Sequence, residues 1–380
     1  MYFDNASTTK IHPEVLDAMM PYLTENYGNA SSHHTVGAIC KRAIEESREI
    51  IASAIGCDSD EIFFTSGATE ANNWAIKGLK NRYHIRPMHM ITSNIEHHSI
   101  TEAMKQRWDF NEDIIYTCVP VDWDGVMDQN KIADNFKLNT RFCSIQHVNN
   151  ETGAIQPIYH IADRCCDNGI IFHTDATQSF GHLPIDVKKY KISLLSAAAH
   201  KIHGPKGVGF LYISKDCQKQ YVPLLNGGQQ ERGLRASTEN VAGIVGFGKA
   251  TEIALRKMGN NTLDILSAMI ELELEKIEGV KINVPTKLTD KRHLSIRIEG
   301  VRAEELMALL DTQNIFVSAG SACNSDSGQP SHVLKALGLS DEEANSTIRI
   351  SLDEDTTKEE VEFLLGYLKY DIEVLRKRGI

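Results

Sequence analysis

Hydrophobic and polar positions follow two alternating patterns along the first two thirds of the chain. Short apolar runs bounded by turn residues are interleaved with stretches whose apolar residues recur near positions i, i+3 and i+4. The runs are typical of buried strands and the stretches of amphipathic helices. Their alternation predicts a mainly parallel sheet with helices on both faces. The expected strands are 62–65, 88–92, 114–119, 142–148, 170–175, 194–198 and 208–213, and the clearest helices are 36–55, 70–79, 158–168 and 241–258.

The last third of the chain has a different order of elements. A long polar-faced helix at 263–277 precedes strand 294–298, helix 303–313, strand 316–319, a further helix, strand 347–352 and a final helix at 358–377. A chain of 380 residues also exceeds what one hydrophobic core normally serves. We therefore expect an α/β protein with two domains. A large domain, 14–251, holds a mainly parallel seven-stranded sheet, and a smaller α+β domain comprises 1–13 and 252–380.

Charge and cysteine usage narrow the functional classes. The net charge of −11 disfavours direct binding to nucleic acid, which depends on clustered Lys and Arg. The N-terminus has no apolar core of a signal peptide, and no run approaches the roughly 20 apolar residues of a membrane span. The eight cysteines lack the spacing of a zinc site, so we expect no metal, no membrane contact and a cytoplasmic location. Except for Cys323, we interpret them as small buried hydrophobes.

A turn between a strand and a helix, residues 65–72 (Thr-Ser-Gly-Ala-Thr-Glu-Ala-Asn), is a candidate phosphate site. The free N–H groups and the dipole of a helix N-terminus attract anions. A threonine cap at the start of a helix is also common for structural reasons alone, so this motif by itself leaves both interpretations open.

An acidic residue, Asp175, ends the apolar run 170–175. Burying a carboxylate there is costly unless a cation pairs with it. The protonated pyridine nitrogen of pyridoxal phosphate (PLP) is such a cation, because the cofactor needs that proton to accept electrons. A helix-capping aspartate is the alternative.

Two lysines follow the small apolar run 194–198. Lys201 comes directly after it, where poor solvation would lower the pKa of its amine and favour Schiff-base chemistry. Lys206 lies in a Pro-Lys-Gly sequence typical of an exposed turn. We therefore expect Lys201 to be the reactive amine.

Cys323 lies in a segment of small and polar residues, 318–331, which is typical of a loop. Accessibility is what a nucleophilic thiol requires. An incidental exposed cysteine is the alternative interpretation.

In this order, these segments resemble the cysteine desulfurases of the NifS/IscS type, within the class V aminotransferase family and PLP fold type I. The resemblance runs nearly end to end. It includes 2–9, 27–34, 147–153, 226–238 and 346–352. It implies removal of sulfur from L-cysteine, giving L-alanine and a Cys323 persulfide for transfer to an acceptor protein, by a homodimer.

The resemblance also implies a role for each site residue. The catalytic residues are Cys323, Lys201 and His97, of which His97 stacks on the cofactor ring and assists acid–base steps. Arg349, with Asn150, binds the substrate carboxylate. The residues implied in PLP binding are Lys201, Ala68, Thr69, His97, Asn150, Asp175, Gln178, His200 and, from the other subunit, Thr238.

The chain departs from the family pattern at two positions in these motifs. Ala198 stands where a serine hydroxyl usually meets the phosphate, and Ser7 stands where alanine is usual. Two other functions remain open at this point. One is a selenocysteine lyase or another class V enzyme, for which Cys323 is dispensable. The other is an inactive sulfur-transfer adaptor.

Overall fold

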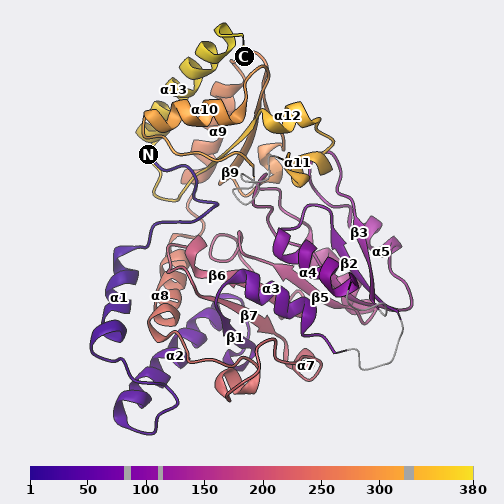
Figure 1. Cartoon of the computed structure of the whole chain (residues 1–380), viewed down its shortest axis with the longest axis vertical. Coiled ribbons are helices and arrows are strands. Elements are labelled where there is room, and N and C mark those ends of the chain that lie inside the picture. Colours follow the sequence, from indigo (N-terminus) through magenta and orange to yellow (C-terminus); the bar gives the residue numbers. More distant parts are fainter. Residues whose placement is uncertain (81–86, 110–113, 321–328, 380) are drawn as a thin grey trace.

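The computed structural model describes residues 1–80, 87–109, 114–320 and 329–379, and its two sheets occupy different parts of the molecule (Figure 1). The larger sheet has seven strands in the order β1-β7-β6-β5-β4-β2-β3. Neighbouring strands are parallel except where β7 pairs with β1 and β6. The predicted mainly parallel seven-stranded sheet is thus confirmed. Its strands are β1 (Ile62–Thr65), β2 (Met88–Ser93), β3 (Ile114–Val119), β4 (Thr140–Ser144), β5 (Ile171–Asp175), β6 (Leu194–Ala198) and β7 (Gly209–Ile213).

Helices cover both faces of this sheet because successive strand residues point to opposite sides. Phe64 and Phe172 belong to a core shared with α2, α6 and α8, whereas Phe63 and Ile171 belong to a second core shared with α3 and α4. The helices of this part are α1 (Pro13–Thr24), α2 (Thr35–Ala54), α3 (Ala68–Lys77), α4 (His98–Asp109), α5 (Gln129–Asp134), α6 (Ile158–Asp167), α7 (Lys215–Gln218) and α8 (Val241–Lys257).

A smaller antiparallel sheet, ordered β10-β9-β8, packs against helices near the C-terminus and has its own hydrophobic core (Figure 1). The N-terminal segment joins this part, because Tyr2 and Asp4 pair with Phe316 and Ser351. The domain limits stay a prediction; the predicted division at 251/252 falls inside α8. The elements are α9 (Thr262–Leu274), β8 (Val280–Ile282), β9 (His293–Ile298), α10 (Ala303–Thr312), α11 (His332–Ala336), α12 (Asp341–Asn345), β10 (Thr347–Ser351) and α13 (Lys358–Lys377).

One strand prediction for this smaller sheet is wrong, and one of its strands was not predicted. Residues 316–319 form only isolated bridges, because Phe316 pairs with Tyr2 and Ser318 pairs with Arg349. A segment that changes partner after two residues builds no continuous ladder. The three-residue strand β8 was not predicted, because it is too short to show an alternating pattern.

The expectation that seven cysteines are buried is wrong for Cys118 and Cys166, which are exposed, and Cys57 is only partly buried. Cys118 lies on β3, an edge strand of the large sheet. Cys166 follows the buried Cys165 in α6, and adjacent helix positions face different directions.

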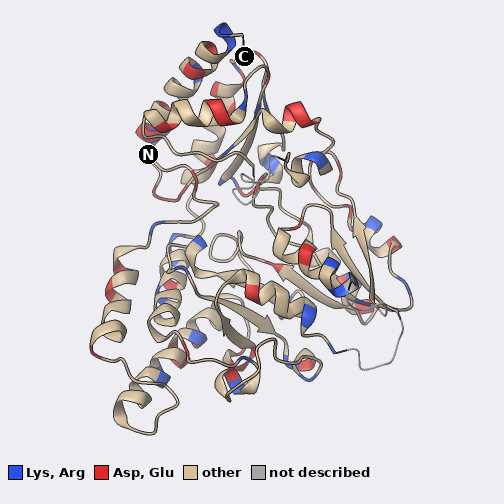
Figure 2. Cartoon of the chain, in the orientation of Figure 1, with Lys and Arg blue, Asp and Glu red and all other residues tan. Residues whose placement is uncertain are grey.

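Charged residues of both signs are interspersed over the outer helices, and the strands of the large sheet are mostly uncharged (Figure 2). Among the helices in the described part of the chain, none is long and apolar enough to cross a membrane.

Candidate active site

A cavity of about 530 Å³ opens at the carboxyl ends of the large sheet's parallel strands. The segments that follow β1, β2, β4, β5 and β6 all contribute to its wall. Ligand sites of open α/β sheets characteristically lie at this edge. Residues 6–8, His332 and Arg349, which lie outside this sheet, complete the lining of the cavity.

The turn before α3 exposes backbone N–H groups to this cavity. Gly67 has a φ of 152°, and a Cβ added to it would meet open space. N–H groups in the first turn of a helix have no acceptor within the helix. The backbone N–H groups of Ala68 and Thr69 have no acceptor among the described residues. This wall can therefore receive an anion such as a phosphate.

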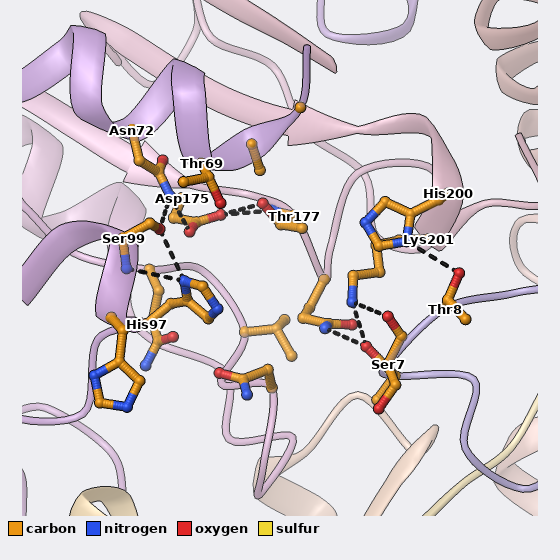
Figure 3. A pocket seen from close by; sticks show the side chains of 18 of the residues that line it. Ser7, Thr8, Thr69, Asn72, His97, Ser99, Asp175, Thr177, His200 and Lys201 are labelled. Atoms are coloured by element: carbon orange, nitrogen blue, oxygen red, sulfur yellow. Dashed lines mark hydrogen bonds between the residues drawn. The ribbon is translucent and has the colours of Figure 1, made fainter. Parts of the chain in front are cut away.

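Asp175, at the end of β5, is held by uncharged groups (Figure 3). Its Oδ2 accepts a hydrogen bond from Asn72 Nδ2 at 2.7 Å, and its Oδ1 accepts from the Thr177 N–H at 2.9 Å. The Thr177 hydroxyl also donates to Oδ1. The side chain is therefore fixed at the cavity wall with no cation among these hydrogen-bond donors.

His97 is linked to Asp175 through two further side chains. Asn72 Nδ2 also donates to Ser99 Oγ at 2.8 Å, and Ser99 Oγ lies 2.8 Å from His97 Nδ1. The Ser99 backbone N–H donates to the same Nδ1 at 3.1 Å, so Nδ1 is an acceptor and the ring proton is on Nε2. Burial lowers the pKa of His97, which favours this neutral form.

Lys201 faces Asp175 from the opposite side of the cavity (Figure 3). Its Nζ donates to the backbone carbonyls of Ala6 at 2.5 Å and Ser7 at 2.8 Å. Burial, reinforced by Arg349 and Arg292, lowers the pKa of this amine to about 7. The rival amine, Lys206, is exposed.

Arg349, on β10, is buried beside Lys201 and holds a second set of partners. Its Nη2 donates to Asp4 Oδ1 at 2.6 Å and to Ser7 Oγ at 2.7 Å, and its Nη1 donates to the Asn150 carbonyl at 2.8 Å. Its buried Nε has no partner among the described residues. The unusual Ser7 hydroxyl also donates to Asp4, so it joins the two charges.

The structure brings most of the predicted site residues together. Gln178 donates to the Ala6 carbonyl, and its buried Oε1 has no partner in the described chain. Thr238 is exposed and lies outside the lining. The predicted residues that line the cavity are Ala68, Thr69, His97, Asn150, Asp175, Gln178, His200, Lys201 and Arg349.

Cys323 lies outside the described residues. Two residues that flank its segment, Gly320 and Ser331, both lie against Glu151, which lines the cavity. Ser331 Oγ donates to Glu151 Oε2, and a Cβ added to Gly320 would lie 3.1 Å from that same oxygen. Burial raises the pKa of Glu151.

Several lining residues were not predicted from the sequence. Ser99 and Asn72 carried a weak signal: Ser99 lies two positions after His97, and Asn72 lies one helical turn beyond Ala68. The unpredicted lining residues that carry functional groups include Ser7, Asn72, His98, Ser99, Glu151, Thr177 and His332.

The donor set of the cavity fits PLP. Lys201 offers an amine of lowered pKa for the aldehyde, Asp175 offers a carboxylate for the ring nitrogen, and the α3 turn offers N–H groups for the phosphate. The unpartnered Gln178 Oε1 and Arg349 Nε leave polar atoms free for the remaining groups of the cofactor and substrate. The fold and this cavity define a PLP enzyme of fold type I.

Comparison with known proteins agrees with this class. The family model "Aminotransferase class-V" matches residues 1–364, and the chain belongs to this family. A cysteine desulfurase IscS from Methanosarcina thermophila is 42% identical over 378 residues, 99% of this chain and 93% of the relative. A solved NifS-like protein superposes with a TM-score of 0.90 at 34% identity, covering 98% of this chain and 99% of the other. A solved structure described as SspA in complex with cysteine superposes with a TM-score of 0.83 at 36% identity. The match covers 94% of this chain and 99% of the other.

Proposed function

We propose that this chain is a cysteine desulfurase that uses PLP to convert L-cysteine into L-alanine while Cys323 takes up the sulfur as a persulfide. Relatives over the full chain carry this activity in their names, and one similar solved structure holds cysteine. The observation that carries the proposal is the placement of Lys201, with its lowered pKa, in one cavity with Asp175 and Arg349.

Substrate binding falls to Arg349 and the backbone around it. A guanidinium group binds a carboxylate through charge-assisted hydrogen bonds. Asp4 and Ser7 keep the group in place, and its Nε remains free of protein partners in the described chain. Arg349 would thus orient the substrate so that its Cα faces Lys201.

Proton transfer falls to Lys201 and His97. When bound, the cofactor supplies an electron-withdrawing ring that accepts the electron pair left at the substrate Cα. An amine with a pKa of about 7 can take a proton from Cα and return it at neutral pH. His97, neutral with its proton on Nε2, can donate a hydrogen bond from that nitrogen and so assist proton transfer on the same side as Asp175.

Sulfur transfer requires a thiol near the substrate, and we assign it to Cys323. A bond forms between the Cys323 sulfur and the substrate sulfur as the substrate C–S bond breaks. The electron pair of that bond remains on carbon, which is protonated to give alanine. One cysteine and one thiol thus give one alanine and one persulfide, with no external oxidant or reductant. The flanking residues Gly320 and Ser331 at the cavity wall support this assignment.

The remaining assignments belong to the same proposal. Ala68, Thr69 and His200 would hold the phosphate, and the exposed Thr238 would reach the phosphate of the other subunit in a homodimer. Gln178 and Asn150 would contact the ring oxygen of the cofactor and the side of the site that binds the substrate carboxylate. The persulfide would pass to an acceptor protein. The cytoplasmic location stays a prediction.

The proposal is tested with purified protein and L-cysteine. Wild type should be yellow, its absorbance should change on addition of cysteine, and alanine and sulfide should form in equal amounts with a reductant present. Cys323→Ala should lose sulfur release. Undiminished release by this variant would favour a lyase, and a colourless, inactive wild type would favour the adaptor.

A further inference from the structure

Behind Lys201, the ring of His182 joins two segments that the site needs. Its Nε2 lies 3.1 Å from the backbone carbonyl oxygen of Lys201. Its Nδ1 lies 2.8 Å from Glu354 Oε1, three residues beyond the end of β10. The side chain of His182 is only 5% exposed. The ring therefore connects the main chain of Lys201 to the segment that follows the Arg349 strand.

A second ring, that of His203, makes the same kind of connection two residues after Lys201. Its Nδ1 lies 2.9 Å from the Lys10 carbonyl oxygen, and its Nε2 lies 2.8 Å from Asp353 Oδ2 as a close ion-pair contact without hydrogen-bond geometry. The backbone of His203 has a φ of 63°, an uncommon conformation for a residue with a side chain. Its N–H donates to Thr9 Oγ1 at 2.8 Å, which holds this conformation.

The partners of these two rings specify their charge. Each ring has one nitrogen at a backbone carbonyl and the other at a carboxylate, and such oxygens only accept hydrogen bonds. A neutral imidazole has a single N–H, so it would leave a lone pair facing an oxygen. All four contacts are favourable only when both rings are protonated on both nitrogens.

The charges around both carboxylates favour their ionised forms, which have no proton to supply. Burial by itself raises the pKa of Glu354, but the neighbouring His182 and Arg292 outweigh it and hold the pKa well below its usual range. Burial likewise raises the pKa of Asp353, and the contact with His203 outweighs that effect.

Other charged groups face the two rings from the start of β9. Asp290 lies close enough to His182 to be influenced by its charge, and it is bound to His293 at 2.9 Å. Arg292 is the nearby cation, and its charge acts on Glu354. His203 faces Asp353 and Glu354. Three carboxylates, Asp290, Asp353 and Glu354, thus lie near the two rings together with one cation, Arg292.

We propose that His182 and His203 are positioning residues of the desulfurase site, each held as an imidazolium, which together fix the Lys201 main chain against Asp353 and Glu354. We call these four residues the histidine latch. It sets the position of Lys201 relative to Arg349, whose strand leads directly into the two carboxylates. This inference rests on the proposed function for its catalytic consequence, but the charge of the rings can be measured without turnover.

Deprotonation of the two histidine rings should break their contacts with Asp353 and Glu354. The contact with Asp353 raises the pKa of His203 despite its burial, which acts in the opposite direction. A histidine whose pKa is raised by folding stabilises the protein fully below its unfolded pKa of about 6.5, and this contribution is lost as pH rises through the folded pKa. The His203 contact with Asp353 should therefore stabilise the latch below about pH 6.5 and weaken as the pH rises.

The charge state is tested by NMR on PLP-loaded protein labelled in its histidine rings. His182→Gln and His203→Gln spectra assign the two signals, and exposed His160→Gln is the matched control. Both latch rings should show two protonated nitrogens at pH 7. A neutral tautomer for either ring at that pH would overturn the proposal, whether or not the enzyme forms alanine.

The positioning role is tested by kinetics and by restoring the charge. His182→Gln keeps an amide donor without the charge, and kcat should fall about tenfold, because small misplacements of reacting groups are costly. His182→Lys restores a cation opposite Glu354 and should recover most of this loss, with less decline at pH 9 than wild type. Equal kcat for wild type and His182→Gln across pH 7 to 9, with both folded by thermal melting, would contradict the proposal.

A metal ion is the competing occupant of the latch. Ligand atoms of His203, Asp353 and Glu354 all lie within 4.8 Å of one another. In the proposal, zinc chloride or EDTA leaves the melting temperature unchanged. A zinc-dependent rise that Asp353→Asn abolishes and the exposed neighbour Asp355→Asn retains would show a cation site instead and overturn the protonated latch.

Discussion

The two walls of the cavity are built differently. The wall around Asp175 comes from a single stretch, 65–178, at the end of one sheet, and its members are joined by amide and hydroxyl groups. The wall around Lys201 is assembled from segments 4–10, 200–203 and 349–354, which are far apart in the chain.

The difference is one of charge as well as of origin. On the Lys201 wall, buried and partly buried charged groups hold one another: Arg349 pairs with Asp4, and His182 pairs with Glu354. When one partner of such a pair is removed or changes protonation, the other charge is left uncompensated, which destabilises the site. The Asp175 wall should therefore tolerate changes of pH, and substitutions that remove a single side chain, better than the Lys201 wall.

The largest expected effect is at Lys201. Lys201→Ala should lower the rate of alanine formation by at least about 1,000-fold, within the range for a positioned acid–base group, and remove the absorbance of covalently held cofactor. Lys206→Ala should keep that absorbance. The reverse pattern would assign the reactive amine to Lys206.

The next effect concerns the Arg349 fork. Arg349→Lys keeps the charge but loses the Nε–H donor that has no partner among the described residues, so kcat/KM for cysteine should fall about 10- to 100-fold, equivalent to a charged hydrogen bond, mostly through KM. Arg297→Lys, on the neighbouring strand β9, is the matched control. A change confined to kcat would argue against substrate binding by Arg349.

A third effect follows from the lowered pKa of Lys201. Only the neutral amine reacts with an aldehyde, so the rate at which apoprotein regains its absorbance with added PLP should rise as pH increases and level off above about 7. An ordinary lysine would give a rate still rising toward pH 10, about tenfold per unit. Stopped-flow absorbance between pH 6 and 10 distinguishes the two.

The smallest effect is expected on the Asp175 wall. Ser99→Ala removes the hydroxyl between His97 and Asn72 but keeps the backbone N–H that sets the ring proton. We expect a loss in kcat of about fivefold, equivalent to a single neutral hydrogen bond. A loss as large as that of Arg349→Lys would show that the two walls are equally sensitive.

The same difference explains how much the sequence predicted. Asp175 and the α3 turn were found because Asp175 ends an apolar strand and the turn directly follows one, so a local pattern marks each of them. Lys201 was found for the same reason. Its partners at Ala6 and Ser7, and the latch residues His182 and Glu354, were missed, because only tertiary packing brings them to it.

The fold shows the same limit. The bounds of the longer strands of the large sheet, and of the long helices that cover it, were predicted within a few residues, because their apolar patterns extend over many positions. Residues 316–319 were wrongly predicted as a strand, because they match an apolar strand pattern although their partners change from Tyr2 to Arg349. Roles drawn from the family resemblance, such as that of Thr238, have no local signal in the chain.

The central claim is that sulfur leaves cysteine for Cys323. The most direct measurement is mass spectrometry of the PLP-loaded protein after one equivalent of L-cysteine, with alanine quantified in the same sample. The account predicts one added sulfur atom, located on the peptide that contains Cys323, for each alanine formed. Alanine formed with no added sulfur on that peptide, and at the same rate in Cys323→Ala, would contradict it.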